Sequence, residues 1–390
     1  MLTVTKDVSP VFSYPPERLG ALSDLLFFDI ETTGFSARRN RLYLIGCLYR
    51  EADGWKLVQW FADRKEAEPE LLSAFFDLLA SRRTLIHFNG EGFDLPFIRQ
   101  RAEACGIAFP SGPVTGVDLY RKIRPLGPLL GLEHLKQKQI ETFLSVRRED
   151  RFGGGELIRV YEEYLRSRSE ELLRILLLHN EDDLKGMPSI LPILFYPDFL
   201  NGPFTFLRQE LTPAAGGDGL EAPLLTLMYE GPVSLPVPAA YEQDGYALSL
   251  SGRRLTLSVR LFEGELKHFY SDYQNYYYLI YEGYAVHKSV GQYVDRAARK
   301  KATARTCFTL ARGLFLPQPA PLWPQRLKTG FSDRRIYAPY SPSLFAQEKT
   351  ALLYLGAVLS AMRLPAAPVL AQQAADAGEG SCLPLIPQKP

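Results

Sequence analysis

A short apolar run that ends in two acids limits most strongly how this chain can fold. Residues 25–28 read Leu-Leu-Phe-Phe, and Asp29 and Glu31 follow them with Ile30 between. An uninterrupted apolar run of this length predicts a strand buried on both faces, as in the middle of an α/β sheet. Since residues two apart on a strand share a face, Asp29 and Glu31 are expected to project together from its end.

The pattern that follows predicts a mixed α/β domain. Asp53-Gly54 is a hairpin turn signal, so an antiparallel meander of three strands is expected around it. After the meander, helices and strands are expected in alternation, followed by a run of helices. The expected strands are 25–29, 41–50, 56–61, 84–88 and 114–119, and the expected helices are 69–79, 93–105 and several within 129–194.

Asp29 and Glu31 indicate a metal site. Two carboxylates side by side repel, and burying either one without a partner costs several kcal/mol. A divalent cation relieves both problems, because Mg²⁺ and Mn²⁺ prefer carboxylate oxygens. The simpler alternative is that the two acids end a strand or pair with Arg38 or Arg39.

Two further acidic motifs stand downstream. Asp94 follows His87-Phe88-Asn89-Gly90 and precedes Pro96, so it is expected in the first turn of a helix, where an acid also stabilises the helix dipole. His179 and Asp183 are four residues apart on an expected helix and therefore share one face. Taken alone, these two could be a surface His–Asp pair.

Together the three motifs resemble those of the DEDD (DnaQ-like) 3′-to-5′ exonuclease superfamily. FFDIETTG resembles its first motif, HFNGEGFDLPFI its second and HNEDD its third, in the same order and over residues 24–195. VDLY at 117–120 and the Gly-Gly-Gly-Glu run at 153–156 further resemble the YprB-like branch of ribonuclease-H-like domains. The histidine is the exception. His179 lies four residues before the last aspartate, a spacing that the superfamily pairs with tyrosine.

The resemblance implies a two-metal phosphodiesterase. Asp29, Glu31, Asp94 and Asp183 would hold two divalent cations, Mg²⁺ or Mn²⁺, and nucleoside monophosphates would be released from a 3′ end. His179 would orient the attacking water or act as its general base. Contacts to the nucleic acid, with a single-stranded 3′ end favoured, are expected next to these acids from Thr32, Asn89 and Phe93.

The second half has a different character. Pro and Gly punctuate residues 200–240, and period-two alternation begins at Tyr246. Turns are expected at 251–252 and 263–264, a strand at 275–281 and helices at 295–306 and 344–362. The expected organisation is an extension (1–23), a ribonuclease-H-like domain (24–198), a linker (199–242), an accessory α+β, hairpin-rich domain (243–363) for which no family is identified, and a disordered tail (364–390).

Basic and aromatic residues gather in the accessory domain. Ten Lys and Arg residues fall in 295–335, directly after a tyrosine-rich segment, 270–284. Cations meet phosphates and rings stack on bases, so Arg296, Arg299, Lys300 and Arg305 are expected to bind nucleic acid. The alternative is a solvated basic face beside a partly buried hairpin.

Composition adds limits. Hydrophobic residues make up 46% and charged residues 23%, as in a globular protein, and the four cysteines form no close pair. No signal peptide or membrane span is visible, which favours a cytoplasmic protein. A structure-selective endonuclease and a non-catalytic nucleic-acid-binding or assembly protein remain alternatives, and DNA and RNA are not distinguished.

Overall fold

The computed structural model describes residues 1–110, 114–147, 154–213 and 222–365. The chain divides into two compact units. Unit 1 comprises Met1–Pro128 and Leu132–Pro197, and unit 2 comprises Leu129–Gly131 and the residues from Asp198 onward. Among the described helices, none is both long and apolar enough to cross a membrane.

Unit 1 is built on a six-stranded mixed sheet with the order β1-β4-β3-β2-β5-β6. The β1–β4, β4–β3 and β3–β2 pairs are antiparallel, whereas β2–β5 and β5–β6 are parallel. The predicted meander and the predicted burial of the apolar strand are therefore confirmed, and this strand, β2, lies between β3 and β5. The strands are β1 Leu2–Val8, β2 Leu25–Thr32, β3 Leu42–Glu51, β4 Gly54–Phe61, β5 Thr84–His87 and β6 Thr115–Asp118.

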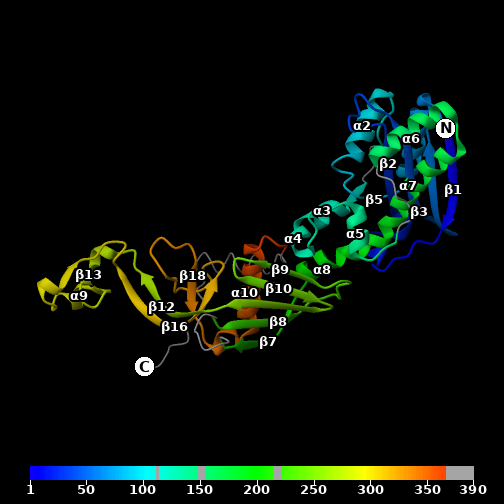
Figure 1. Ribbon diagram of the computed structural model, residues 1–390. Helices are drawn as coiled ribbons and strands as arrows, with labels where there is room; N and C mark the ends of the chain where they lie inside the picture. The colour runs from blue at the N-terminus through cyan, green and yellow to red at the C-terminus, as the bar shows by residue number, and fades with distance from the viewer. Residues whose placement is uncertain (111–113, 148–153, 214–221, 366–390) are drawn as a thin grey trace. The chain divides into compact units, whose positions relative to one another are not determined.

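Helices cover the sheet of unit 1 (Figure 1). Helix α7 contacts β2 and β3, and Ser169 caps its start by accepting a hydrogen bond from the Leu172 N–H. Helix α1 buries its apolar side against the same sheet, where Phe28 and Phe75 stack at 5.4 Å. The helices are α1 Glu68–Ala80, α2 Asp94–Ala104, α3 Leu119–Ile123, α4 Gly127–Leu130, α5 Gln137–Phe143, α6 Gly154–Ser167, α7 Glu170–Ile190 and α8 Phe195–Asn201, and the last residues of α4 and α8 belong to unit 2.

Unit 2 is rich in β-structure. Its first sheet is antiparallel in the order β7-β8-β11-β10-β9, and α10 lies against it, with the Tyr229 hydroxyl donating to Ala351 O at 3.0 Å. A closed barrel follows in the order β12-β16-β18-β17. The elements are β7 Thr205–Thr212, β8 Leu224–Glu230, β9 Ala239–Gln243, β10 Tyr246–Ser251, β11 Arg254–Arg260, β12 Phe262–Phe269, β16 Phe308–Gln318, β17 Leu327–Lys328, β18 Ile336–Pro339 and α10 Glu348–Ala361.

A third, three-stranded sheet in the order β14-β13-β15 is inserted between β12 and β16. Its strands are β13 Tyr276–Leu279, β14 Ala285–His287 and β15 Arg299–Lys301, and the short helix α9 Lys288–Gly291 follows β14. Figure 1 shows β13 and α9 together at one end of the yellow part of the chain.

The structure differs from the sequence-based expectations at four places. Residues 2–8, expected in an extension, form edge strand β1 of the unit 1 sheet. The expected linker 199–242 contains paired strands β7 and β8. The expected helix at 295–306 is wrong, since a single 3₁₀ turn, Arg296–Ala298, leads into β15. Gly264 lies within β12 opposite Gly313 and not in a turn. The predicted disordered tail lies almost wholly outside the described residues.

Candidate metal centre

Strand β2 presents the first two acids. Asp29 and Glu31 lie on one face of the strand, beyond the apolar residues that fix it in the core, and a β-bulge follows Glu31. Both neighbouring strands pair with β2, and α7 packs across it. The two carboxylates are therefore held on a rigid strand in the interior of the unit.

Helix α7 brings His179 and Asp183 to the same place. His179 is buried, and its Nε2 lies 3.4 Å from Glu31 Oε1 and 3.3 Å from Asp183 Oδ2. Glu31, His179 and Asp183 each offer a ligand atom, and these atoms lie within 4.8 Å of one another. The four-residue spacing on the helix thus places the imidazole between two carboxylates.

Electrostatic interactions link Asp94 to this group of acids. Burial raises the pKa of Asp94 to about 7, and the negative charges of Asp118 and Asp183 add to the effect. Burial also raises the pKa of Asp29 well above its ordinary value, and the charges of Asp183, Glu31 and Asp94 add to it. The charges of Glu31, Asp94 and Asp183 thus all act on Asp29, which links carboxylates from β2, α2 and α7 in one electrostatic group.

A pair of buried amides supports Asp29 from behind. Asn180 Nδ2 donates to Asp29 Oδ2 at 2.9 Å, and Asn180 Oδ1 accepts from Gln59 Nε2 at 2.9 Å. Gln59 Nε2 also donates to Leu177 O at 2.8 Å, so the chain of bonds is anchored on the backbone of α7. A Cβ at Gly46 would overlap Asn180 Oδ1, which explains why β3 has no side chain there. These amides were not predicted, although Asn180 lies inside the third motif.

Asp118 organises the loop that carries Asp94. Its carboxylate accepts hydrogen bonds from the N–H groups of Asn89 at 3.0 Å, Glu91 at 3.1 Å and Arg121 at 3.3 Å. Asn89 adopts a left-handed backbone with φ of 61°, which this loop requires. The motif around Asp118 was noticed in the sequence, but its role in holding the loop was not predicted.

His87 is a structural neighbour of this loop. The ring is buried, and its Nδ1 accepts from the Gly90 N–H at 3.1 Å and lies 3.6 Å from Asp118 Oδ2. Burial lowers the pKa of His87. His87, Glu91 and Asp118 form the second group of potential metal ligands among the described residues. Asp118 already accepts three backbone hydrogen bonds, so this group is the weaker candidate.

Aromatic and polar residues border the acids. Phe93 directly precedes Asp94, and its ring meets that of Phe35 edge-on at 6.1 Å. Phe35 is 88% exposed, an unusual position for a phenylalanine, and it was not singled out in the sequence. Thr32 Oγ1 donates to Gly34 O at 3.0 Å, and Asn89 is exposed on the loop before Asp94.

The basic residues expected to bind nucleic acid lie on the inserted sheet of unit 2. Arg296, Lys300 and Arg305 are exposed. Arg299 is half-buried, because its guanidinium lies 4.6 Å from the centre of the Tyr277 ring and donates to Gly291 O. Arg299 is therefore engaged within the inserted sheet, whereas the other three are exposed, with the Lys300 ammonium 5.3 Å from the centre of the Tyr278 ring.

Comparison with known proteins agrees with this architecture. A family model described as RNase_H superfamily matches residues 26–194. The mixed sheet and its helices in unit 1 have the ribonuclease-H-like fold. A DNA polymerase of Pyrococcus glycovorans is 27% identical over 149 residues, which is 35% of this chain. The match spans only 19% of the polymerase.

Solved structures show more distant similarity. A family B DNA polymerase from Pyrobaculum calidifontis is 15% identical, with a TM-score of 0.37 over 64% of this chain and 35% of the polymerase. A product-bound exonuclease I is 12% identical, with a TM-score of 0.27 over 52% of this chain and 58% of the exonuclease. TM-scores this low establish no shared fold over the lengths compared.

Proposed function

We propose that unit 1 is a divalent-metal-dependent nuclease that hydrolyses phosphodiester bonds. The observation that carries the proposal is that Glu31, His179 and Asp183 offer ligand atoms within 4.8 Å of one another, with Asp29 and Asp94 near enough to interact electrostatically with the same acids. Bound cations would offset the repulsion and desolvation that disfavour the ionised forms of clustered acids. Their hard oxygen donors fit Mg²⁺ or Mn²⁺, and the four would hold two such ions.

In the proposed hydrolysis, the cations, His179 and Asn180 would each have a separate role. Bound cations would supply an activated water and neutralise charge at the phosphodiester. His179 would orient that water or accept its proton, since Nε2 faces Glu31 and Asp183 at 3.4 and 3.3 Å. Asn180 would keep Asp29 Oδ2 fixed, so that the other oxygen of Asp29 is directed to a cation.

The expected reaction is 3′-to-5′ exonuclease action, as the resemblance to the DEDD superfamily and its YprB-like branch implies. Phe93 and the exposed ring of Phe35 would stack on the terminal bases of a single-stranded 3′ end. Thr32 and Asn89, which flank the acids, would contact its sugar or phosphate groups. Arg296, Arg299, Lys300 and Arg305 of unit 2 were predicted to bind nucleic acid, and we retain this for the three exposed ones. The similarity to a DNA polymerase supports nucleic acid as the partner.

Two alternatives differ in their products. A structure-selective endonuclease of the same fold would use the same acids but release long fragments. A non-catalytic binding or assembly protein would bind nucleic acid without cleaving it. Neither alternative calls for an exposed ring such as Phe35 next to Phe93, the residue that directly precedes Asp94.

The test is cleavage of end-labelled substrates. Single- and double-stranded DNA and RNA, labelled at the 5′ or 3′ end, are incubated with Mg²⁺, Mn²⁺ or EDTA. Mononucleotides released from 3′ ends, only with metal, support the proposal. Asp94→Asn should abolish release, while Asp198→Asn, which changes an acid outside the group, should leave it intact. Release by Asp94→Asn at the wild-type rate would exclude the assignment.

A further inference from the structure

The insertion between β12 and β16 is a small module with its own core. We call residues 270–307 the tyrosine module. Phe269 and Phe308 pair at its base, Tyr270 and Tyr276 stack at 5.0 Å, and Ala285, Ala302 and Cys307 are buried beneath the rings. Because the tyrosine rings and the small buried residues beneath them fill this core, the outward-facing residues of the module are not needed for its packing.

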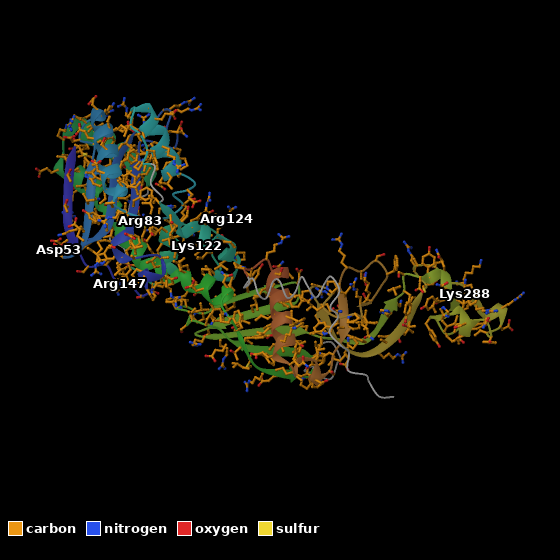
Figure 2. All side chains as sticks on the ribbon, turned by 180° about the vertical axis from the view of Figure 1, so that it is seen from behind. Asp53, Arg83, Lys122, Arg124, Arg147 and Lys288 are labelled. Carbon is orange, nitrogen blue, oxygen red and sulfur yellow. The ribbon has the colours of Figure 1, made fainter. Side chains whose placement is uncertain are left out.

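The outward surface of the tyrosine module is basic. Residues 270–307 contain six Lys or Arg residues and three acids, which gives a net charge of +3. One of the acids, Asp295, is engaged as a cap and accepts from the Ala297 N–H at 2.8 Å. Across the described residues, none of the six cations forms an ion pair with a carboxylate. Figure 2 labels one of them, Lys288, on this part of the chain.

Cations and rings are interleaved on the module. Arg299 and Lys288 lie 4.6 and 5.7 Å from the centre of the Tyr277 ring, and Lys300 lies 5.3 Å from that of Tyr278. These contacts hold both rings in place, because a cation over a ring face is attracted by its quadrupole. Two other tyrosines have no such cover, since Tyr281 is 80% exposed and Tyr293 is 84% exposed.

The two exposed rings belong to neighbouring segments. Ile280 N–H donates to Ala298 O at 2.9 Å, which places Tyr281 beside the turn at Arg296–Ala298. Arg299 donates to Gly291 O, which ties the segment that carries Tyr293 to the same turn. Both rings are thus set around one basic turn. Tyrosine rings left this open add nothing to the module's core, so a ligand is the simplest reason for them.

We infer that the tyrosine module binds single-stranded nucleic acid, with bases stacked on Tyr281 and Tyr293 and phosphates on Arg296, Lys301 and Arg305. Stacking requires bases whose faces are open, which a duplex does not offer, and exposed cations supply the sequence-independent attraction to the backbone. The inference rests on the proposed function for its ligand class, but it needs neither the acids of unit 1 nor a metal ion.

The first test removes the rings. Anisotropy of fluorescein-labelled dT30 and U30, and of a 30-base-pair duplex, is measured with the full chain in EDTA, where no cleavage occurs. Stacking is worth ~1–3 kcal/mol per base, so the double variant Tyr281→Ala/Tyr293→Ala should bind the single strands at least about 30-fold more weakly. Leu207→Ala, an exposed apolar side chain on β7, serves as the control and should bind like the wild type.

The second test measures the salt dependence. Each cation that meets a phosphate of a single strand contributes about −0.7 to the slope of log K against log salt concentration. The triple variant Arg296→Gln/Lys301→Gln/Arg305→Gln should therefore reduce the slope by about 2. Arg260→Gln, an exposed cation at the end of β11, should not change it.

Three outcomes would overturn the inference: wild-type affinity in the ring variant, an equal loss for the duplex, or no binding of oligonucleotides by the wild type at low salt. The last outcome, with capture of acidic peptides instead, would assign the surface to a protein partner. Failure here is separable from failure of the nuclease proposal. Cleavage of a trinucleotide at saturating concentration depends on the acids and should be unchanged in the ring variant.

Discussion

Removal of the Asn180 side chain tests the link between the buried amides and the metal centre. Asn180→Ala deletes the donor to Asp29 Oδ2 at 2.9 Å and the acceptor of the Gln59 Nε2 bond. Gln59 Nε2 keeps Leu177 O at 2.8 Å as the acceptor of one N–H, while its other N–H loses its partner, so the variant should also lower the stability of unit 1 by about 1–3 kcal/mol. The effect on Mn²⁺ binding acts through the orientation and charge of one carboxylate, Asp29.

The size of the effect follows from that bond. A hydrogen bond to a charged acceptor contributes about 1.5–3 kcal/mol. Asp29 must be ionised when it binds a cation, whereas in the metal-free protein burial and the charges of Asp183, Glu31 and Asp94 raise its pKa and favour the neutral form. The loss should therefore appear mainly in the metal-bound protein. Affinity for Mn²⁺ should fall by roughly 10- to 100-fold, the range found when residues behind metal ligands are changed.

Titration calorimetry with Mn²⁺ at pH 7.5 measures this change directly. Gln318 is the matched control, since it is a buried amide of unit 2 that donates to Gln325 O at 2.8 Å and accepts from the Trp323 N–H at 3.0 Å. Gln318→Ala should lower the stability of unit 2 and leave Mn²⁺ affinity unchanged. The reasoning is refuted if Asn180→Ala binds Mn²⁺ within twofold of the wild type, or if Gln318→Ala weakens binding equally.

Three further predictions follow from the same site. Gly46→Ala places a Cβ 2.6 Å from Leu184 Cδ1, so the free energy of unfolding in urea should fall by about 1–3 kcal/mol. Gly116→Ala, whose Cβ would lie 3.6 Å from its nearest neighbour, should change it little. Equal losses in the two variants would contradict the steric argument. In EDTA, the pKa of about 7 for Asp94, against 3.8 when exposed, means that the native state holds the proton more tightly. The contribution of Asp94 to the free energy of unfolding is fully present below pH ~4 and is lost, by roughly 4 kcal/mol, as the pH rises through 7. Asp94→Asn should therefore remove this pH dependence of the free energy of unfolding, measured by urea titration at pH 5 and 8. Phe35→Ala should raise KM for single-stranded substrates by roughly 5- to 100-fold with unchanged folding, as expected for a lost stacking platform; an unchanged KM in steady-state assays would assign the ring another role.

The elements around the acids could be predicted from sequence because their signals are local. The apolar run 25–28 and the Asp53-Gly54 turn specify a central strand and a hairpin by themselves, and both are present in the sheet. Likewise, two periodicities gave the shared faces. Residues two apart on β2 put Asp29 and Glu31 on one face, and residues four apart on α7 put His179 and Asp183 on one face, where they lie within 4.8 Å of Glu31.

Elements that depend on distant partners could not be predicted in this way. The strand β1 has one neighbour, β4, and its mostly exposed, polar sequence carries little apolar alternation. The strands β7 and β8 lie among Pro and Gly residues that suggested a linker, and their pairing to each other and to β11 decides the outcome. For 299–301 the decisive partner is β13, which pairs Tyr277 with Lys301.

The site residues that the sequence did not predict were missed for a different reason. Asn180 and Asp118 act through hydrogen bonds to residues 151 and 29 positions away, and spacing along the sequence does not encode such contacts. Phe35 is exceptional because of its exposure, which only the structure supplies. The signals that were available are chemical: an amide inside the HNEDD motif and an acid at the end of a predicted buried strand.

The most direct test of the four-acid metal site is anomalous diffraction from crystals of the wild-type protein soaked in Mn²⁺. The expected result is two peaks about 4 Å apart, each in contact with carboxylate oxygens of Asp29, Glu31, Asp94 or Asp183. Peaks confined to His87, Glu91 and Asp118, or no peak near any of the four acids at saturating Mn²⁺, would contradict the assignment.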